Sequence, residues 1–274
     1  MSSSPPIVLS FAASDPTGGA GLQADLLTIA SLGCHPVSVV TALSVQDTRG
    51  VESLHPVEPD LVAAQARRLL EDVPVAAFKL GVLGSARNVE IVAAILAERP
   101  GAPVVLDPVL ASGRGDPLAD AQTVQALRQT LFARTTVLTP NSVEARRLAG
   151  TGPDSSLRDC ARSLAELGCK YVLVTGTHEA GKQVVNVLYD ARGVVREDRW
   201  NRLAGSYHGS GCTLASALAA LLAKGLDVAA AAREAQDYTW RALAAGFRPG
   251  KGQLVPNRAF GSRDETARSL RNHS

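Results

Sequence analysis

Short apolar runs alternate along the chain with longer stretches in which apolar positions recur at helical spacing. The apolar runs predict buried strands at Ile7–Ala13, Val37–Val45, Ala76–Gly81, Pro103–Val109, Thr136–Pro140 and Tyr171–Gly176. The stretches between and after them predict helices at 21–32, 60–71, 86–98, 118–132, 141–148, 155–167, 211–224 and 227–245. Strands that alternate with helices indicate an α/β fold, in which helices cover both faces of a mostly parallel central sheet.

A different pattern near residue 190 breaks this alternation. Gln183–Tyr189 and Gly193–Trp200 each alternate apolar and polar positions on either side of a turn sequence. This predicts a hairpin, and therefore an antiparallel edge of the sheet. No repeat or low-complexity linker divides the chain, so residues 1–274 are expected to form a single domain with flexible ends at 1–6 and about 262–274.

Polar residues and glycines follow the predicted strands. They occupy Asp15–Gly21, Gln46–Gly50, Gly81–Leu83, Asp107–Arg114, Asn141–Glu144, Thr175–His178 and the loop before Cys212, and Gln46–Gly50 is expected to be a polar loop. In an open α/β sheet, ligands bind beyond the carboxyl ends of the strands. These segments are therefore the expected binding site.

The segment 205–225 predicts a loop that runs straight into a helix. Gly209, Ser210 and Gly211 precede an unbroken apolar run. The first N–H groups of such a helix have no partner, and together with the helix dipole they favour an anion such as phosphate. Cys212 falls in the first turn, where the helix N-terminus would lower the pKa of its thiol and provide a partial thiolate as a base. The alternative is a glycine turn before a buried packing helix.

Asn141 and Glu144 open a helix directly after a predicted strand. Three residues apart, they lie on one helix face and could hold a magnesium ion through water. The alternative is a capping pair, since Asn141 is a good N-cap and Glu144 is the third residue after it. Asp107 at the end of another strand could be a second carboxylate near the metal, or a turn residue beside Pro108.

The first strand is followed by Gly19-x-Gly21-x-x-Ala24, which matches the dinucleotide-binding fingerprint in form. Asp15 and Asp25 flank these glycines, and their negative charge would repel a pyrophosphate. A dinucleotide oxidoreductase is therefore the last of the functions considered, and Asp25 suits a hydrogen-bond acceptor for a polar ligand.

Three further polar residues stand in the expected site. Gln46 can present both a donor and an acceptor to an aminopyrimidine edge, or it can belong to a solvated loop. Of the 5 histidines, only His178 and His208 fall at a strand end or in the glycine loop, where either could contact phosphate.

Composition narrows the class of protein. The net charge is +2 and the basic residues are scattered, so no nucleic-acid or membrane surface is indicated. The 4 cysteines form no CxxC pair, which argues against a zinc site and for a cytoplasmic chain with free thiols. The chain has no G-x-x-x-x-G-K-[ST] string, so it is not a P-loop NTPase.

Taken together and in order, eight stretches resemble those of the hydroxymethylpyrimidine/phosphomethylpyrimidine kinases of thiamine biosynthesis. They read SDPTGGAGLQADLLTIASLG, VTALSVQDTRGV, KLGVLG, VVLDPVL, GDPL, LTPNSVEA, YVLVTGTH and HGSGCTLASALAALLAKG. The resemblance implies a ribokinase-like three-layer sandwich. It also implies ATP- and Mg²⁺-dependent phosphorylation of 4-amino-5-hydroxymethyl-2-methylpyrimidine to its monophosphate and of the monophosphate to the diphosphate.

The resemblance implies roles for the matching positions. The implied pyrimidine-binding residues are Gln46, Asp25, Gly21, Val82 and Val109. Those implied on the ATP side are Asn141, Glu144, Thr175, Gly176 and Asp107, with Glu144 and Asp107 as metal ligands. Gly209, Ser210 and Gly211 would form the anion hole for the transferring phosphate, and Cys212 stands where sugar-kinase relatives carry an aspartate base.

The chain also departs from the family pattern. Thr175-Gly176-Thr177-His178 replaces Lys-Gly-Gly-His, which removes a lysine from the ATP phosphates, and Arg114 falls where the pattern has a lysine. Two alternatives therefore stay open: a pyridoxal or pyridoxine kinase on the same scaffold, and a pyrimidine-binding regulatory protein whose kinase activity has decayed. The resemblance also suggests a homodimer.

Overall fold

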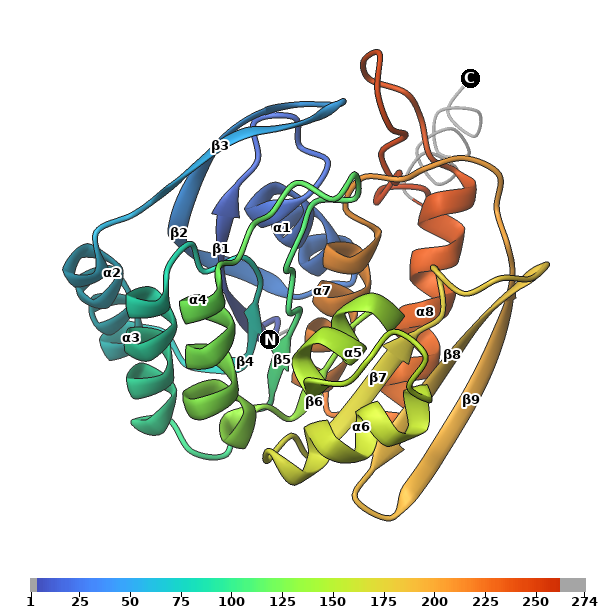
Figure 1. The fold of residues 1–274 in the computed structure, drawn as a ribbon. Coiled ribbons are helices and arrows are strands. Elements are labelled where there is room, and N and C mark those ends of the chain that lie inside the picture. Colours follow the sequence, from blue (N-terminus) through green and yellow to red (C-terminus); the bar gives the residue numbers. More distant parts are fainter. Residues whose placement is uncertain (1–3, 262–274) are drawn as a thin grey trace.

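One sheet of nine strands forms the centre of the computed structural model, which describes residues 4–261. The strand order is β3-β2-β1-β4-β5-β6-β7-β8-β9 (Figure 1). The strands are β1 (Ile7–Ser14), β2 (His35–Asp47), β3 (Gly50–Pro56), β4 (Val75–Leu80), β5 (Val104–Leu106), β6 (Val137–Leu138), β7 (Tyr171–Thr175), β8 (Gln183–Asp190) and β9 (Gly193–Asn201).

The sheet is parallel in its middle and antiparallel at both edges. Strands β2, β1, β4, β5, β6 and β7 run parallel. The predicted hairpin is confirmed as β8 and β9, which extend the sheet antiparallel to β7. At the opposite edge, β3 pairs antiparallel with β2, and the sequence analysis did not predict this strand.

The predicted polar loop at Gln46–Gly50 is therefore wrong at both ends, and only Thr48 and Arg49 form a turn. Gln46 and Asp47 end β2, and they pair with Val51 and Gly50 of β3. The sequence of β3, GVESLHP, lacks a regular alternation. An edge strand with few buried positions leaves only a weak hydrophobic pattern, so pairing with β2 rather than local sequence defines it.

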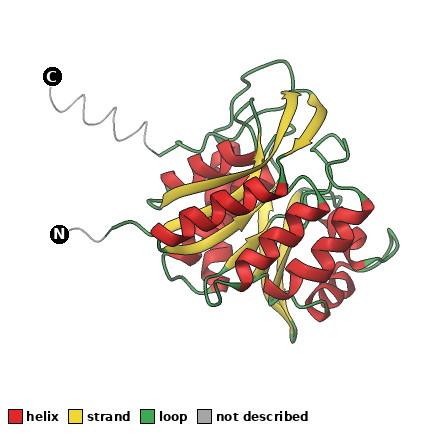
Figure 2. Cartoon of the chain, turned by 90° about the vertical axis from the view of Figure 1, so that its left-hand side faces the viewer, coloured by secondary structure: helices red, strands yellow, loops and turns green. Residues whose placement is uncertain are grey.

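Helices cover both faces of the sheet (Figures 1 and 2). One face carries α1 (Gly21–Ser31), α7 (Ser210–Ala223) and α8 (Val228–Ala244). The other carries α2 (Pro59–Asp72), α3 (Ala86–Ala97), α4 (Ala121–Ala126), α5 (Ser142–Ala149) and α6 (Leu157–Glu166). The single helix predicted at 118–132 is instead α4 followed by a π-helical turn at Leu127–Leu131 and a 3₁₀ turn at Phe132–Arg134.

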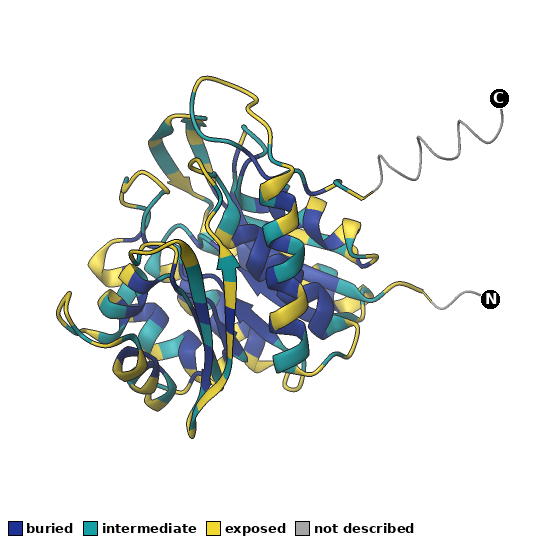
Figure 3. Cartoon of the chain, turned by 90° about the vertical axis from the view of Figure 1, so that its right-hand side faces the viewer, coloured by how far each residue is buried: buried dark blue, intermediate teal, exposed yellow. Residues whose placement is uncertain are grey.

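Neighbouring residues of the central strands enter different cores. Val8 packs under α7 and α8, whereas Leu9 packs against the helices of the opposite face. Val105 and Leu106 divide in the same way. Because both faces are buried, the central strands read as continuous apolar runs rather than as alternating ones. Figure 3 shows the result, with the central strands buried and exposure on outer helix faces, loops and the edge strands.

Five helices begin with a side-chain cap, α2 begins with Pro59 in its first turn instead, and α1 and α7 open on the site with neither. Side-chain caps from Ser85, Asp120, Asn141, Ser156 and Asp227 begin α3, α4, α5, α6 and α8. Helices α1 and α7 have no side-chain cap. Their first N–H groups are therefore not satisfied in this way, and both helices begin at the same edge of the sheet.

The chain changes direction across the sheet at β1. It continues to β2 on one side and returns to β4 on the other, which opens a crevice at the carboxyl ends of β1 and β4.

Of the ends expected to be flexible, 1–3 and 262–274 lie outside the described residues, while the Pro6 carbonyl accepts a hydrogen bond from the His35 N–H. Among residues 4–261, no helix is long and apolar enough to cross a membrane.

Candidate active site

A cleft of about 510 Å³ opens at the carboxyl ends of the parallel strands. It brings together most of the predicted site residues from seven separate segments. Those that line it are Gly21, Gln46, Val82, Asp107, Val109, Asn141, Glu144, Thr175, Gly209, Ser210, Gly211 and Cys212. Asp25 and Gly176 do not line it.

The predicted anion site lies at the start of α7. Gly209 is its N-cap with φ 82°, a left-handed conformation that suits glycine. A Cβ at Gly209 would lie 1.9 Å from the Gly19 carbonyl oxygen, so the loops before α1 and α7 touch here. The first hydrogen bond within the helix runs from the Thr213 N–H to the Gly209 carbonyl. The N–H groups that precede it are available to an anion.

The prediction that Cys212 is partly a thiolate is wrong. Its side chain is 9% exposed, and burial raises the pKa of its thiol to about 12 although Lys79 acts in the opposite sense. The cost of a charge in a buried site exceeds the benefit of the helix N-terminus, which is a partial charge. Cys212 therefore lines the cleft as a neutral thiol.

Asp25 was predicted to contact the substrate, but the structure places it away from the cleft. It is fully buried, and its carboxylate accepts hydrogen bonds from Ser10 Oγ at 2.6 Å and Ser216 Oγ at 2.8 Å. It also pairs with Lys79 Nζ at 2.8 Å. Its partners lie on the central strands β1 and β4 and on α7, so Asp25 anchors Lys79 rather than reaching into the cleft.

Lys79 is a site residue that the sequence analysis missed. Its side chain is fully buried on β4 and reaches the base of the cleft. Burial alone would lower the pKa of Lys79, but the carboxylate of Asp25 raises it, so the ammonium stays charged. A single lysine in the apolar run AAFKLG was the available signal, since a buried charge requires a partner.

Asp107 and Glu144 place two carboxylates in the cleft. Burial raises the pKa of Asp107 to about 6, against the effect of Lys79. Burial and the neighbouring Asp107 raise the pKa of Glu144 to about 8. Asp107 Oδ2 is buried and has no hydrogen-bond partner. Its carboxylate oxygens would lie 3.5 and 3.8 Å from a Cβ at Gly211, next to the anion site.

The capping interpretation of Asn141 and Glu144 is confirmed. Asn141 Oδ1 accepts from the Glu144 N–H at 2.9 Å, and Glu144 Oε2 accepts from the Asn141 N–H at 2.9 Å. Glu144 Oε1 also accepts from the Leu110 N–H at 3.3 Å. The cap fixes the Glu144 carboxylate at the wall of the cleft, so capping and metal binding do not exclude each other.

At the other end of the cleft, Gln46 lies beside His208. Gln46 Nε2 is 3.3 Å from His208 Nε2, which is also 2.8 Å from Asp15 Oδ2. Asp15 further accepts from the N–H groups of Thr17 at 2.8 Å and Ala20 at 2.7 Å. These bonds occupy the glycine loop that matched the dinucleotide fingerprint, and a carboxylate fills the place where a pyrophosphate would bind.

A third group of residues lines the cleft near Thr175. The Gly176 N–H donates to Asn186 Oδ1 at 3.1 Å, and a Cβ there would lie 2.4 Å from the Val185 carbonyl oxygen. Gly176 thus shapes the strand end. Trp200 and Trp240 also line this part of the cleft, with their ring centroids 6.4 Å apart.

Arg114 does not stand in for a missing lysine in this structure. It lies outside the lining of the cleft, and its guanidinium donates to the Arg49 carbonyl in the β2–β3 turn. Asp116 of the same loop accepts from the Val51 N–H at 3.2 Å. These contacts fasten the glycine-rich loop at 112–116 to the β2–β3 hairpin.

Comparison with known proteins identifies the family of this chain. The profile of the family described as phosphomethylpyrimidine kinase matches residues 15–257. The chain belongs to this family. It is 42% identical over 254 residues to the hydroxymethylpyrimidine/phosphomethylpyrimidine kinase of Streptomyces coelicolor, with 90% of this chain and 92% of the relative covered.

Solved structures show the same fold. The ADP complex of Bacillus subtilis pyridoxal kinase superposes with a TM-score of 0.85 at 28% identity, covering 93% of this chain and 98% of the other. The phosphomethylpyrimidine kinase of Clostridium difficile has a TM-score of 0.76 at 29% identity, covering 87% and 99%. The predicted ribokinase-like fold, with a mostly parallel sheet between helical layers, is confirmed.

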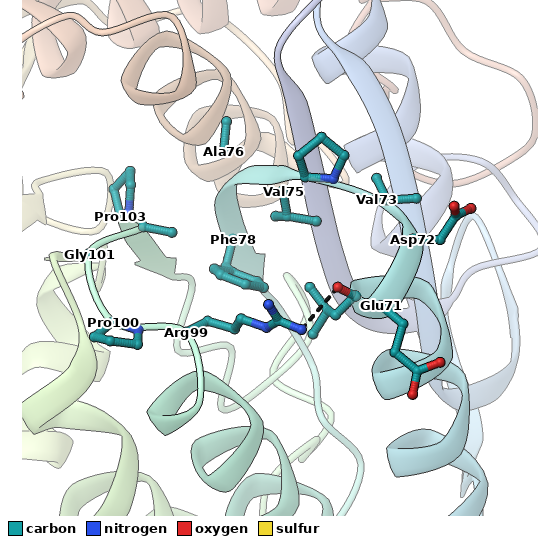
Figure 4. A pocket seen from close by; sticks show the side chains of 13 residues that line it. Glu71, Asp72, Val73, Val75, Ala76, Phe78, Arg99, Pro100, Gly101 and Pro103 are labelled. Atoms are coloured by element: carbon teal, nitrogen blue, oxygen red, sulfur yellow. Dashed lines mark hydrogen bonds between the residues drawn. The ribbon is translucent and has the colours of Figure 1, made fainter.

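This member of the phosphomethylpyrimidine kinase family has another hollow, of about 720 Å³, at the opposite end of the sheet. Figure 4 shows it below the start of β4, with the Arg99 side chain extended across it. Arg99 Nη2 donates to the Leu70 carbonyl at 2.9 Å. Glu71 and Asp72 also line it, and the other lining residues are aliphatic, proline, glycine or Phe78.

Proposed function

We propose that this protein transfers the γ-phosphoryl group of ATP to the hydroxymethyl group of 4-amino-5-hydroxymethyl-2-methylpyrimidine, and then a second phosphoryl group to the monophosphate. The observation that carries this proposal is the position of the Asp107 carboxylate, 3.5 Å from where a Cβ of Gly211 would lie at the start of α7. A group that can hold a cation thus adjoins a helix N-terminus that can hold a phosphate. Phosphoryl transfer needs such positioning and charge stabilisation above all.

The pyrimidine would bind at the Gln46 end of the cleft. The amide of Gln46, which lies beside His208, can donate to and accept from an aminopyrimidine edge. Val82 and Val109 offer apolar contacts for the ring, and Gly21 also lines the cleft, where it packs so closely that a Cβ would lie 2.3 Å from the Ala13 carbonyl oxygen. The buried Asp25 takes no direct part and instead fixes Lys79.

The transferring phosphate would lie on the N–H groups of Ser210 and Gly211. These donors are preorganised by the helix, and there they would stabilise the negative charge of the transition state. Cys212 would lie next to the acceptor hydroxyl. Because its thiol is protonated, Cys212 is not ready to accept the proton of that hydroxyl before the reaction. In a loose transition state the hydroxyl proton can leave late.

Asp107 and Glu144 fit a magnesium ion that arrives with ATP. Mg²⁺ usually keeps several waters and takes one or two carboxylates in addition to substrate phosphates. The unpartnered Asp107 Oδ2 and the raised pKa values of both carboxyl groups indicate that Lys79 alone does not balance their charge and that a further cation would fit here. A bound Mg²⁺ would supply charge neutralisation on the β- and γ-phosphates. Thr175 and the strand end that Gly176 shapes would contact the nucleotide.

We also infer that residues 1–274 act as one domain, that two copies associate, and that the reaction takes place in the cytoplasm. One sheet that spans the chain from β1 to β9 supports the first inference. Light scattering of the purified protein tests the second, and fractionation of cells tests the third.

A product assay tests the proposed reaction. The purified protein is incubated with MgATP and, separately, with the hydroxymethylpyrimidine, its monophosphate and pyridoxal, and the products are measured by mass. Monophosphate and diphosphate of the pyrimidine are the expected products. Phosphorylation of pyridoxal alone would favour the second candidate, which the likeness to Bacillus subtilis pyridoxal kinase supports. Binding of the pyrimidine without any transfer would favour a regulatory protein.

A further inference from the structure

Arg258 joins the two glycine loops of the active site. It follows α8, and its whole residue is 5% exposed. Its guanidinium donates to the carbonyls of Gly19 at 2.5 Å, Gly18 at 3.2 Å and Gly209 at 3.5 Å. Its Nε donates to Thr213 Oγ1 at 3.1 Å. Every one of these acceptors belongs to the loop after β1, the N-cap of α7 or the first turn of α7.

The acceptors of Arg258 are all neutral. Within residues 4–261, Arg258 forms no ion pair with a carboxylate. A buried guanidinium is normally paired with an acid, because desolvation of an unpaired charge is costly. Arg258 instead lies beside the anion site, where three carbonyls and the Thr213 hydroxyl satisfy its donors. A negatively charged ligand at Gly209–Gly211 would complete this charge balance.

The same side chain controls the geometry of the helix start. A Cβ at Gly209 would lie 1.9 Å from the Gly19 carbonyl oxygen, so the two loops are in direct contact. Thr213 Oγ1 donates to the Gly209 carbonyl at 2.8 Å while it accepts from Arg258. Arg258 therefore holds the Gly209 carbonyl both directly and through Thr213. The N–H groups that follow Gly209 keep their direction only while this carbonyl is fixed.

The main chain around Arg258 is itself anchored on α8. Tyr238 Oη donates to the Arg258 carbonyl at 2.7 Å, and the Asn257 N–H donates to the Ala242 carbonyl at 2.9 Å. One residue thus ties α8, the loop after β1 and the start of α7 together. The profile match of the family ends at residue 257, just before it.

We propose that Arg258 is a positioning residue for phosphoryl transfer: it locks the N-terminus of α7 against the loop after β1, and its positive charge strengthens the hold of that N-terminus on the transferring phosphate. This inference rests on the proposed kinase function. A misplaced donor or a lost charge at such a site lowers the rate more than it weakens binding of the acceptor.

The test compares Arg258→Lys and Arg258→Met with the matched controls Arg241→Lys and Arg241→Met. Arg241 lies nearby on α8, but it is exposed and pairs with Asp237. For Arg258→Met we expect kcat to fall about 10- to 100-fold with the pyrimidine KM changed less than about 3-fold, and a smaller loss for Arg258→Lys, which keeps the charge. Both Arg241 variants are expected to match the native enzyme.

A separate measurement distinguishes positioning from simple stabilisation. In Arg258→Ala, millimolar guanidinium chloride should restore part of kcat, whereas sodium chloride at the same ionic strength should not. If Arg258→Met does not fold, Arg258→Lys and this rescue decide the question. Native kcat in Arg258→Lys and Arg258→Ala, or an activity loss that only follows the folded fraction measured by circular dichroism, would overturn the proposal.

Failure of the proposed function gives a different result. If the native protein transfers no phosphate to the pyrimidine, that function is wrong before any variant is compared. Arg258 is then assessed by calorimetric titration with inorganic phosphate. Binding at least 10-fold weaker in Arg258→Met than in the native protein supports an anion-site role, and equal binding overturns it.

Discussion

His208 Nε2 lies 2.8 Å from Asp15 Oδ2, and this contact joins the loop after β1 to the loop before α7. Burial alone would raise the pKa of Asp15, but hydrogen bonds from His208 and from the Thr17 N–H lower it to about 2. The ordinary value is 3.8. The folded protein therefore holds Asp15 ionised over a range in which the unfolded chain is protonated.

The first prediction concerns acid stability. Since the pKa of Asp15 is lowered by folding, its contribution is present above pH 3.8 and disappears as the pH falls toward about 2. That contribution is about 2 kcal/mol. In urea unfolding between pH 4 and 2, Asp15→Asn should lose less stability than the native protein. Asp72→Asn, a change at an exposed acid near the end of α2, is the control, and an equal acid slope in Asp15→Asn and the native protein would contradict the assignment.

The second prediction concerns Glu144 in the absence of a divalent cation. Its pKa is raised from 4.5 to about 8 in the folded protein, so its ionisation destabilises the fold as the pH rises through this interval. Glu144→Gln should be more stable than the native protein at pH 8 by on the order of 1–2 kcal/mol, a value reduced for solvent screening. Urea unfolding at pH 5 and pH 8 measures this.

Magnesium provides the control for Glu144. Millimolar Mg²⁺ should stabilise the native protein at pH 8 more than Glu144→Gln, and turnover of the variant should fall about 100-fold. Glu90→Gln alters an exposed acid that pairs with Arg87, and it should match the native protein in both measurements. Equal stabilisation of Glu144→Gln and native protein by Mg²⁺ would remove Glu144 from the metal site.

The third prediction concerns the thiol of Cys212. Because the neutral thiol would lie next to the acceptor hydroxyl, Cys212→Ala should lower turnover about 10- to 100-fold by misplacing that hydroxyl, and leave the ATP KM within about 2-fold. Cys169→Ala is the matched control, because burial also raises the pKa of Cys169 to about 12 but that residue lies in the core away from the cleft. Native turnover in Cys212→Ala would exclude a chemical role.

Alkylation supplies an independent test of the same residue. A thiol whose pKa is about 12 is almost entirely protonated at pH 7.5, so iodoacetamide should label Cys212 slowly in the folded protein. Peptide mass analysis after timed labelling measures the rate. Labelling as fast as that of free cysteine would restore the thiolate interpretation.

The fourth prediction concerns the close approach at Gly209. Gly209→Ala places a Cβ 1.9 Å from the Gly19 carbonyl oxygen, so the loops must separate and the anion site must deform. We expect loss of most transfer activity and a lower midpoint of thermal unfolding. Gly225→Ala is the control, because Gly225 also has positive φ but has open space around its Cβ position. It should cost about 1 kcal/mol and little activity.

The fifth prediction concerns recognition of the pyrimidine. Gln46→Ala should raise the pyrimidine KM about 5- to 100-fold, because it leaves polar groups of the ligand without partners, and it should leave the ATP KM nearly unchanged. Steady-state kinetics with each substrate varied in turn measures both. Asp47→Asn, the exposed neighbour at the end of β2, is the control. An equal rise in both KM values would place Gln46 outside the pyrimidine site.

The sequence by itself predicted the features that depend on local pattern. Buried strands such as Ile7–Ser14 carry continuous apolar runs, and helix starts such as Asn141 carry capping residues, so both are visible over a few positions. The gathering of polar residues at the strand ends also located the cleft, because a parallel sheet brings those ends together. The order of the glycine-rich and acidic motifs indicated the family.

Tertiary structure decided what each polar group does in the site. Asp15 and Asp25 lie ten residues apart and flank the same glycines, yet Asp15 lines the cleft and Asp25 is buried with Lys79. Partners far away in the chain likewise determine the edge strand β3, the neutral thiol of Cys212 and the hydrogen bonds of Arg258 to the two glycine loops. Burial and charge are set by the atoms that folding brings around a group, and a linear pattern does not specify those atoms.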